Sequence, residues 1–454
     1  MLIQITDNSS ISCSEIEELK DSDKANLEKI ANVPIKQLTL DDTPNLLVFP
    51  RDLDLYGDNI SESNILELQG DNIITGNIMG FVGINDTQIN IRSRFAKDDG
   101  EDYFLHYMLQ KVFAINLFDI KHTTKQEQVF DFLLYLFPHF LRKALEQGFY
   151  KKYRQFEHND ANIRGPINVS RHIRQNIPFR GTVAYSTREH SYDNEVTQLI
   201  RHTIEYIKTK KHGAHILSDN KEMKEAVKQI VIATQTYNVR ERQKVINQNL
   251  RPVKHPYFSA YTGLQKICLQ ILRHKFLKYG QEKDKVYGIL FDGAWLWEEY
   301  LNTIFEESQL DITHAKNKTK ENGIQIYEGS IRYYPDFYKK EEGDAKGEKS
   351  FVLDAKYKRL ENSIGRDDLF QMITYMHVLP AKSCALLYPI KSEDTIVQND
   401  KIIKSEPKEL MGLGGEIYSY GLKIPFKGTI NEFWKDMSDV EKALNEVVQS
   451  IYTK

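Results

Sequence analysis

The feature that most constrains the fold of this chain is an apolar run that ends in an acid and a lysine, Phe351-Val352-Leu353-Asp354-Ala355-Lys356. A short apolar run of this kind predicts a strand inside a sheet. Side chains two positions apart on a strand point to the same face. Asp354 and Lys356 are therefore expected to lie side by side at the end of a buried strand.

A second acid lies upstream, in Tyr334-Pro335-Asp336, within the strand-like segment 331–337. If the two strands are neighbours, the carboxylates of Asp336 and Asp354 meet at one point. Two such oxygen ligands, with waters and a phosphate oxygen, make a Mg²⁺ site, for which Mn²⁺ is the alternative. The metal would polarise a phosphodiester and lower the pKa of a bound water, while Lys356 orients the reacting groups or stabilises charge. The pattern predicts metal-dependent phosphodiester hydrolysis.

Three further side chains extend this candidate site. Gln371 and Tyr375 are four positions apart on a helical pattern, so they share one helix face. Glu298 lies on a predicted amphipathic helix that begins after Asp292-Gly293, and it is expected to give the metal a third carboxylate. The predicted catalytic residues are Asp336, Asp354, Lys356, Gln371 and Tyr375, and the predicted metal ligands are Asp336, Asp354 and Glu298.

Each part of this pattern also has a structural explanation. Acid-x-Lys triplets are frequent in a chain with 28% charged residues, and Asp344-Ala345-Lys346 is even nearer to Asp336. That triplet lies in a polar stretch that is expected to be a solvated hairpin loop, whereas only Asp354-Ala355-Lys356 follows an apolar strand-like run. Taken singly, these residues could equally occupy turns, a strand edge or the protein surface. Their order within about 80 positions favours the catalytic interpretation.

The sequence predicts a multidomain α+β protein. Residues 1–96 form a β-rich N-terminal region with a hairpin over 78–91, since Asn85-Asp86 is a turn signal between apolar runs. Residues 97–280 form a mainly helical middle domain. Residues 281–454 form an α/β domain in the order α-β-β-β-α-β, with expected elements at 294–305, 324–327, 331–337, 351–355, 367–378 and 384–388.

A basic stretch lies in the middle domain, between residues 151 and 188. The whole chain carries a formal net charge of only −3, so contacts with DNA must come from local patches rather than from a uniformly basic surface. The stretch either contacts DNA or an acidic partner, or it is simply a solvated helix face. The candidate contact residues are Arg154, Arg164, Arg171 and Arg174.

Composition favours a soluble, cytoplasmic protein with no membrane partner. The three cysteines lie far apart and form no zinc-binding spacing. The most apolar run, 129–141, is interrupted by Asp131 and Pro138 and is expected to be a buried helix rather than a membrane span. No basic N-terminal segment followed by an apolar stretch is present, and no phosphate-binding loop with the right spacing is found.

Taken together, these segments resemble the McrC family, the nuclease subunit of McrBC-type restriction systems that target 5-methylcytosine. The nuclease motifs belong to the wider PD-(D/E)xK superfamily, and Gln371 and Tyr375 match a motif of its RecB-like members. Arg92-Ser93-Arg94 departs from the family pattern, which tends to have proline-lysine there. The other segments that carry the resemblance are 80–84 with 89–91, 164–167, 192–195 and 290–298.

The resemblance implies a PD-(D/E)xK restriction-endonuclease-like domain and a Mg²⁺-dependent DNA endonuclease subunit of a modification-dependent restriction system. It also implies a partner, a hexameric McrB-like AAA+ NTPase that uses GTP or ATP, into whose ring the N-terminal region would dock. Two alternatives stay open: a stand-alone RecB-like nuclease for DNA repair or processing, and a catalytically inactive adaptor that activates an NTPase.

Overall fold

The computed structural model describes residues 1–39, 46–50, 62–97, 102–113, 125–210, 213–218, 221–277, 286–308, 310–316, 321–329, 332–339, 350–358, 364–391, 400–412, 414–426 and 428–453. The chain divides into two compact units. The first comprises Met1–Asp41, Asn45–Ala114 and Glu282–Lys454, and the second comprises Asp42–Pro44 and Ile115–Gln281. The first unit therefore holds both the N-terminal region and the residues predicted to carry the chemistry.

The first unit contains a five-stranded sheet in the order β1-β7-β6-β10-β3. The predicted hairpin is confirmed: β6 (Ile78–Ile84) and β7 (Thr87–Arg92) pair in antiparallel fashion around Asn85, whose φ of 48° suits a tight turn. β1 (Leu2–Thr6) pairs in parallel with β7. A smaller sheet of β2 (Ser10–Ser12), β5 (Asn72–Thr75) and β4 (Leu66–Gln69) and the helix α1 (Asp21–Ile30) share its apolar core.

Strand β10 (Val286–Asp292) joins this N-terminal sheet, although about 190 residues separate it from β7. It pairs antiparallel with β6 over seven residue pairs and parallel with β3 (Leu46–Phe49) over four. Gly80 and Gly288 permit this close pairing. A Cβ at Gly80 would lie 2.3 Å from the carbonyl oxygen of Ile289, and one at Gly288 would lie 2.1 Å from that of Phe81.

A second sheet carries most of the predicted α/β region, in the order β11-β14-β15-β16-β19-β17. The predicted helices and strands are confirmed as α11 (Gly293–Glu307), β12 (Ile324–Gln325), β15 (Phe351–Ala355), α12 (Arg366–Val378) and β16 (Ser383–Lys391). The segment 331–337 instead divides into β13 (Arg332–Tyr333) and β14 (Phe337–Lys339), with Asp336 between them. Strands β11 (Thr313–His314), β17 (Ile402–Lys404), β18 (Lys408–Glu409) and β19 (Glu416–Ile424) and the helix α13 (Ile430–Thr453) were not predicted.

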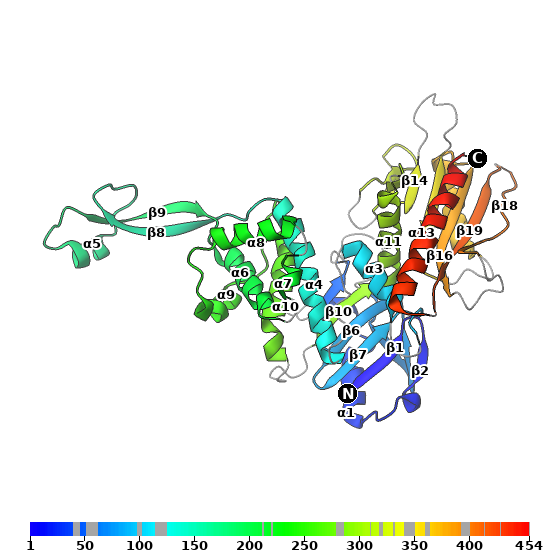
Figure 1. Cartoon of the computed structure of the whole chain (residues 1–454), viewed down its shortest axis with the longest axis horizontal. Helices are drawn as coiled ribbons and strands as arrows, with labels where there is room; N and C mark the ends of the chain where they lie inside the picture. The colour runs from blue at the N-terminus through cyan, green and yellow to red at the C-terminus, as the bar shows by residue number, and fades with distance from the viewer. Residues whose placement is uncertain are drawn as a thin grey trace. The chain divides into compact units, whose positions relative to one another are not determined.

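Strand β16 also runs beyond Pro389, where the sequence predicted its end. The parallel partner β15 pairs with β16 only as far as Leu387, whereas β19 continues alongside to Lys391. Past Leu387 one edge of β16 thus faces no strand among the described residues, and a proline without an N–H is tolerated there. Helix α12 covers one face of the sheet through an apolar cluster with Val352, Cys384 and Leu386. Helices α11 and α13 contact each other, and Figure 1 shows both alongside the strands.

The second unit is helical with a projecting β-hairpin. Its main helices are α4 (Lys125–Glu146), α6 (Glu195–Lys208), α8 (Lys221–Ala233), α9 (Arg242–Gln248) and α10 (Ser259–Leu277), and α4 spans the helix that was expected at 129–141. The solvated helix face considered for residues 151–188 is wrong for most of the stretch. There β8 (Lys152–Asp160) pairs with β9 (Val183–Ser191) over nine residue pairs, and the short helix α5 (Val169–Asn176) lies between them (Figure 1).

The described helices include none that is long and apolar enough to cross a membrane.

The pairing of β6 with β10 gives a direct test of the fold. Gly80→Ala is expected to lower the free energy of unfolding by about 1–3 kcal/mol, because the new methyl group overlaps a backbone oxygen that cannot move without breaking the pairing. Thermal unfolding of the purified chain measures this effect. Gly76→Ala is the matched control, since nothing lies within 4 Å of a Cβ at Gly76. Equal melting temperatures for the two variants would contradict the pairing.

Candidate active site

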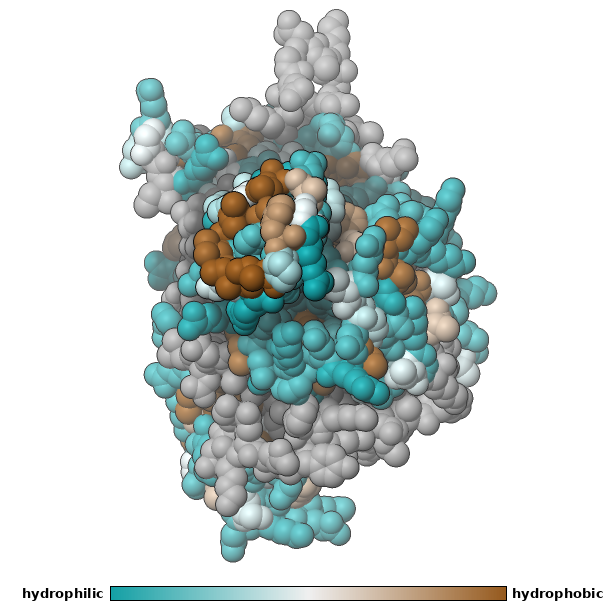
Figure 2. Space-filling model, turned by 90° about the vertical axis from the view of Figure 1, so that its left-hand side faces the viewer, coloured by the Kyte–Doolittle hydropathy of each residue, from teal (hydrophilic) through white to brown (hydrophobic). Residues whose placement is uncertain are grey.

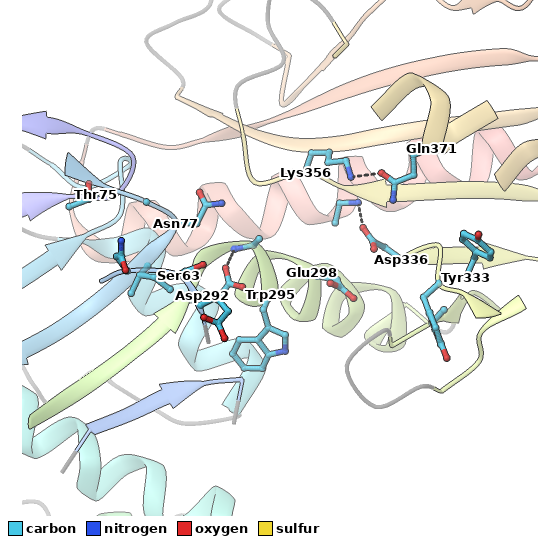
Figure 3. Close-up of a pocket in the computed structure, with 18 of the residues that line it drawn as sticks. Ser63, Thr75, Asn77, Asp292, Trp295, Glu298, Tyr333, Asp336, Lys356 and Gln371 are labelled. Carbon is cyan, nitrogen blue, oxygen red and sulfur yellow. Dashed lines mark hydrogen bonds between the residues drawn. The ribbon is translucent and has the colours of Figure 1, made fainter. Parts of the chain in front are cut away.

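A cavity of about 860 Å³ opens in the first unit and contains most of the predicted site residues. One part of its lining comes from the second sheet, α12 and Glu298 of α11, and the other from the segment 62–78 and the start of α11. Figure 3 shows the labelled side chains on both sides. The lining includes Glu298, Asp336, Lys356, Gln371 and Tyr375 on the first side and Ser63, Thr75, Asn77, Asp292 and Trp295 on the second.

The two aspartates meet because their strands are neighbours. β14 pairs antiparallel with β15, with Phe337 opposite Leu353. Asp336 directly precedes β14 and therefore lies next to the C-terminal end of β15. An oxygen of the Asp336 carboxylate accepts the backbone N–H of Ala355 at 2.7 Å. Asp354 lies on β15 and is fully buried. The structure therefore brings Asp336 and Asp354 together as the sequence predicted.

Lys356 lies in contact with both Asp354 and α12. Its Nζ is 2.6 Å from Oδ2 of Asp354, while Oδ1 of that carboxylate has no hydrogen-bond partner among the described residues. The same Nζ donates to Oε1 of Gln371 at 3.2 Å. The amide of Gln371 donates to the hydroxyl of Tyr375 at 3.1 Å, and that hydroxyl donates to the carbonyl oxygen of Tyr334 at 3.4 Å. A continuous chain of hydrogen bonds thus connects the lysine to the segment that precedes Asp336.

Burial and mutual repulsion of the two carboxylates determine the pKa values at the site. Burial raises the pKa of Asp336 well above its usual range, and the neighbouring carboxylates of Asp354 and Glu298 raise it further. Burial also raises the pKa of Asp354, against the opposing effect of Lys356. For Lys356, burial lowers the pKa, but the carboxylates of Asp354 and Asp336 outweigh it, so its pKa is raised and the side chain stays charged. A second cation at this point would relieve the remaining repulsion.

Glu298 lines the cavity from α11, but it is already engaged. Nε2 of His314 lies 2.7 Å from its Oε1, and since a carboxylate only accepts, the imidazole donates. No group of three or more His, Cys, Asp or Glu side chains in the described part of the chain is assembled as a metal site. A cation held by Asp336 and Asp354 would therefore need further oxygen ligands from water or substrate.

Two residues of this site were missed from the sequence, His314 and Asp368. Oδ1 of Asp368, at the start of α12, lies 3.8 Å from Nζ of Lys356, and its other oxygen lies 2.5 Å from Nζ of Lys358. Asp368 stands in an acidic pair that is typical of a helix N-terminus, and His314 has no neighbouring motif. No sequence signal separated either from ordinary positions. The competing triplet at 344–346 lies outside the described residues.

The four candidate arginines lie on the projecting hairpin in the second unit, far along the chain from the cavity residues. Arg171 is largely internal: it donates to the carbonyl oxygens of His158 and Tyr185 at 2.6 and 2.7 Å and pairs with Glu157. Arg154 donates to the carbonyl oxygen of Asp193 at 2.5 Å. Arg164 and Arg174 are exposed. Their role as DNA or partner contacts stays a prediction.

Comparison with known proteins assigns the chain to a family. The family model described as McrBC 5-methylcytosine restriction system component matches residues 73–389. The chain therefore belongs to this family of McrBC restriction-system components. None of the curated proteins matches it.

The solved structures that the chain matches include two from one organism. One is described as a half-complex from a tetradecameric assembly of Thermococcus gammatolerans McrB AAA+ hexamers with bound McrC. A chain of it matches with a TM-score of 0.50 and 15% identity, over 98% of this chain and 100% of that one. The other, a cryo-EM structure of the McrBC complex of the same organism, matches with a TM-score of 0.36 and 14% identity, over 69% and 90%. At this identity the first match supports the likeness in fold.

The carboxylate pair generates a prediction about stability. Asp336→Asn is expected to raise the free energy of unfolding by on the order of 1 kcal/mol at neutral pH in the absence of divalent cations. The amide removes a charge that burial and Asp354 disfavour, yet keeps an acceptor for the N–H of Ala355. Differential scanning calorimetry with EDTA measures the change. Asp311→Asn, at an exposed carboxylate, is the control, and a less stable Asp336→Asn variant would contradict the prediction.

Proposed function

We propose that this chain is a Mg²⁺-dependent DNA endonuclease subunit of a modification-dependent restriction system, with a PD-(D/E)xK core at about residues 285–390. The observation that carries the proposal is the convergence of Asp336, Asp354 and Lys356 from neighbouring strands at one cavity: Asp336 and Lys356 line it, and the buried Asp354 contacts Lys356 directly behind the lining. Two acids and a lysine in that arrangement suit phosphodiester hydrolysis better than binding alone, because a pure binding surface has no need of two buried, mutually repelling carboxylates.

The donor set suits a hard divalent cation. Asp336 and Asp354 offer oxygen ligands only, and Oδ1 of Asp354 is buried without a hydrogen-bond partner among the described residues. Asp336 and Asp354 would hold Mg²⁺, or Mn²⁺ in its place, with Glu298 as a further carboxylate on the same cavity wall. When bound, the metal supplies Lewis-acid polarisation of the phosphodiester and a more acidic water.

The remaining residues act through charge and orientation. The ammonium group of Lys356 stabilises negative charge that develops on the phosphate oxygens. Gln371 and Tyr375 fix the direction of that ammonium group through the hydrogen bonds that join them to it. Asp368 adds a second carboxylate near Lys356 and helps to keep the lysine charged.

A comparison of the two acid-x-Lys triplets tests the catalytic proposal. Asp354→Asn and Lys356→Ala are each expected to reduce cleavage of methylated DNA by at least 100-fold, in Mg²⁺ with the partner AAA+ NTPase and GTP or ATP. Asp344→Asn and Lys346→Ala are the matched controls and should cut normally. Gel analysis of DNA products measures the rate, and the partner's nucleotide hydrolysis is followed in parallel.

Each outcome of this experiment favours one interpretation. Cleavage that vanishes in the first pair of variants, with stimulated nucleotide hydrolysis unchanged, supports a nuclease that works with the NTPase. Cleavage by the wild type without any NTPase favours the stand-alone RecB-like nuclease. Stimulated hydrolysis without cleavage of methylated or unmethylated DNA by the wild type favours the inactive adaptor.

The projecting hairpin is our candidate for a second surface that contacts the AAA+ partner, beside the N-terminal region, whose docking into the ring stays a prediction. Large apolar side chains at and near its end are 47–70% exposed, and Figure 2 shows apolar side chains gathered on the face toward the viewer, bordered by hydrophilic ones. An exposed apolar patch of this kind marks an interaction site. Arg164 and Arg174 lie beside it and would pair with acidic groups of the partner. The apolar residues are Ile163, Ile167, Val169, Ile173, Ile177 and Phe179.

The double variant Ile177→Ser, Phe179→Ser is expected to weaken binding to the AAA+ partner at least tenfold, because two exposed apolar anchors are lost. Its melting temperature should match that of the wild type, since both side chains are more than 60% exposed. Ile232→Ser, at an exposed apolar position on α8 in the same unit, is the control. Calorimetric titration with the purified partner measures the affinity, and unchanged binding would exclude the hairpin as the contact.

A further inference from the structure

The cavity is larger than a metal ion and one phosphate group require. Its volume of about 860 Å³ is in the range of pockets that enclose a whole ligand, roughly 300–1,000 Å³. The residues of the proposed catalytic centre line only one part of it. The remaining space is available to the parts of a substrate that adjoin the reacting phosphate.

Two aromatic side chains flank the carboxylates in this cavity. Trp295 lies three positions before Glu298 on α11, so both are on the same helix face. Tyr333 lies on β13, three positions before Asp336. Both line the cavity, and Figure 3 shows Trp295 on one side of Glu298 and Tyr333 on the other.

Both aromatic side chains make few contacts with the described part of the protein. Trp295 is half-buried and makes one ring contact, with Phe113 at 6.3 Å between centroids, while its indole N–H has no hydrogen-bond partner among the described residues. Tyr333 is 42% exposed, and its hydroxyl likewise has no partner in the described part of the chain. By contrast, the hydroxyl of Thr75 on the same wall is held by hydrogen bonds to Thr6 and Ser9.

The charge of the lining disfavours a double helix as the occupant. An acidic lining repels any DNA backbone, but it repels a duplex, with one phosphate for about every 1.7 Å of its axis, more than a single strand, with one for about every 3.4 Å. The described side chains that line this cavity include only two cations, Lys356 and Arg332. The acids among them are Glu62, Glu67, Asp292, Glu298 and Asp336. Affinity must therefore come mainly from contacts other than charge.

We propose that the cavity is a binding site for unpaired DNA, in which the bases next to the phosphate at Asp336 and Asp354 stack on Trp295 and Tyr333. Stacking on an aromatic side chain is available only to a base that has left the duplex, and it contributes about 1–3 kcal/mol for each base. The inference rests on the proposed nuclease function and adds the substrate class: a locally melted strand rather than a closed duplex.

Equilibrium binding separates stacking from catalysis. The full chain carrying Asp354→Asn is titrated into fluorescently labelled 20-mers in Ca²⁺: a single strand, a closed duplex, and a duplex with four unpaired positions. Adding Trp295→Ala or Tyr333→Ala is expected to weaken binding of the single strand and the partly unpaired duplex at least about fivefold. Binding of the closed duplex should be weaker at the start and should not change further.

Conservative variants distinguish a loss of stacking from a loss of the folded structure. Trp295→Phe and Tyr333→Phe keep an aromatic face and should retain most of the affinity, whereas Trp295→Leu keeps apolar volume and should not. Tyr327→Ala, at a 71% exposed tyrosine that is not among the cavity lining, is the control. Melting temperatures of all variants are compared with that of the parent.

The inference is overturned if the closed duplex binds as tightly as the partly unpaired one, if all three DNAs lose affinity equally, or if no variant changes binding. It is also overturned if no DNA binds at micromolar concentrations. Cleavage of the same DNAs by the wild type with Mg²⁺ and the AAA+ partner tests the nuclease separately. Cleavage that does not depend on Trp295 and Tyr333 would support the nuclease and reject the stacking site. Binding that depends on both residues, without any cleavage, would support the stacking site and reject the nuclease.

Discussion

The insertion of β10 between β3 and β6 is the constraint on which the candidate site depends. α11 begins directly after β10, with Asp292 accepting the N–H of Ala294 and with the N–H of Gly293 bonded to the carbonyl oxygen of Asn77 at 2.8 Å. The N-terminal sheet therefore fixes where α11 starts. The indole of Trp297 then donates to the carbonyl oxygen of Leu387 on β16 at 3.2 Å, which attaches the same helix to the second sheet.

This arrangement explains why acids that are scattered along the sequence come together at one site. The side chain of Glu298 reaches the cavity only because α11 is held between two sheets, and its carboxylate is directed by His314 on β11. The segment that contains His314 also holds Asp336, since the N–H of Ala315 donates to the carbonyl oxygen of Asp336 at 3.1 Å. The adjacent residues His314 and Ala315 thus contact two acids, Glu298 and Asp336, that lie far apart in the sequence.

The charged groups of the site lower the stability of the fold. Two carboxylates lie close together under burial that disfavours their charge, and one ammonium group compensates them in part. The hydrogen bonds from Lys356 through Gln371 and Tyr375 to the segment of Asp336 keep this cluster in one geometry. Such an arrangement is typical of a centre that awaits a cation and a substrate, because stability alone would favour apolar residues there.

The sequence by itself determined the local elements and the order of the acids and the lysine. The apolar run before Asp354 predicted β15, the helical patterns at 294–305 and 367–378 predicted α11 and α12, and the proline before Asp336 marked the neighbouring acid. Only the tertiary structure decided that β10 completes the N-terminal sheet, that His314 contacts Glu298, and that residues 151–188 form a projecting hairpin. The physical reason is that periodicity and turn signals report on a few neighbouring residues, whereas these contacts join residues that are distant in the chain or partly exposed, where no local pattern records the partner.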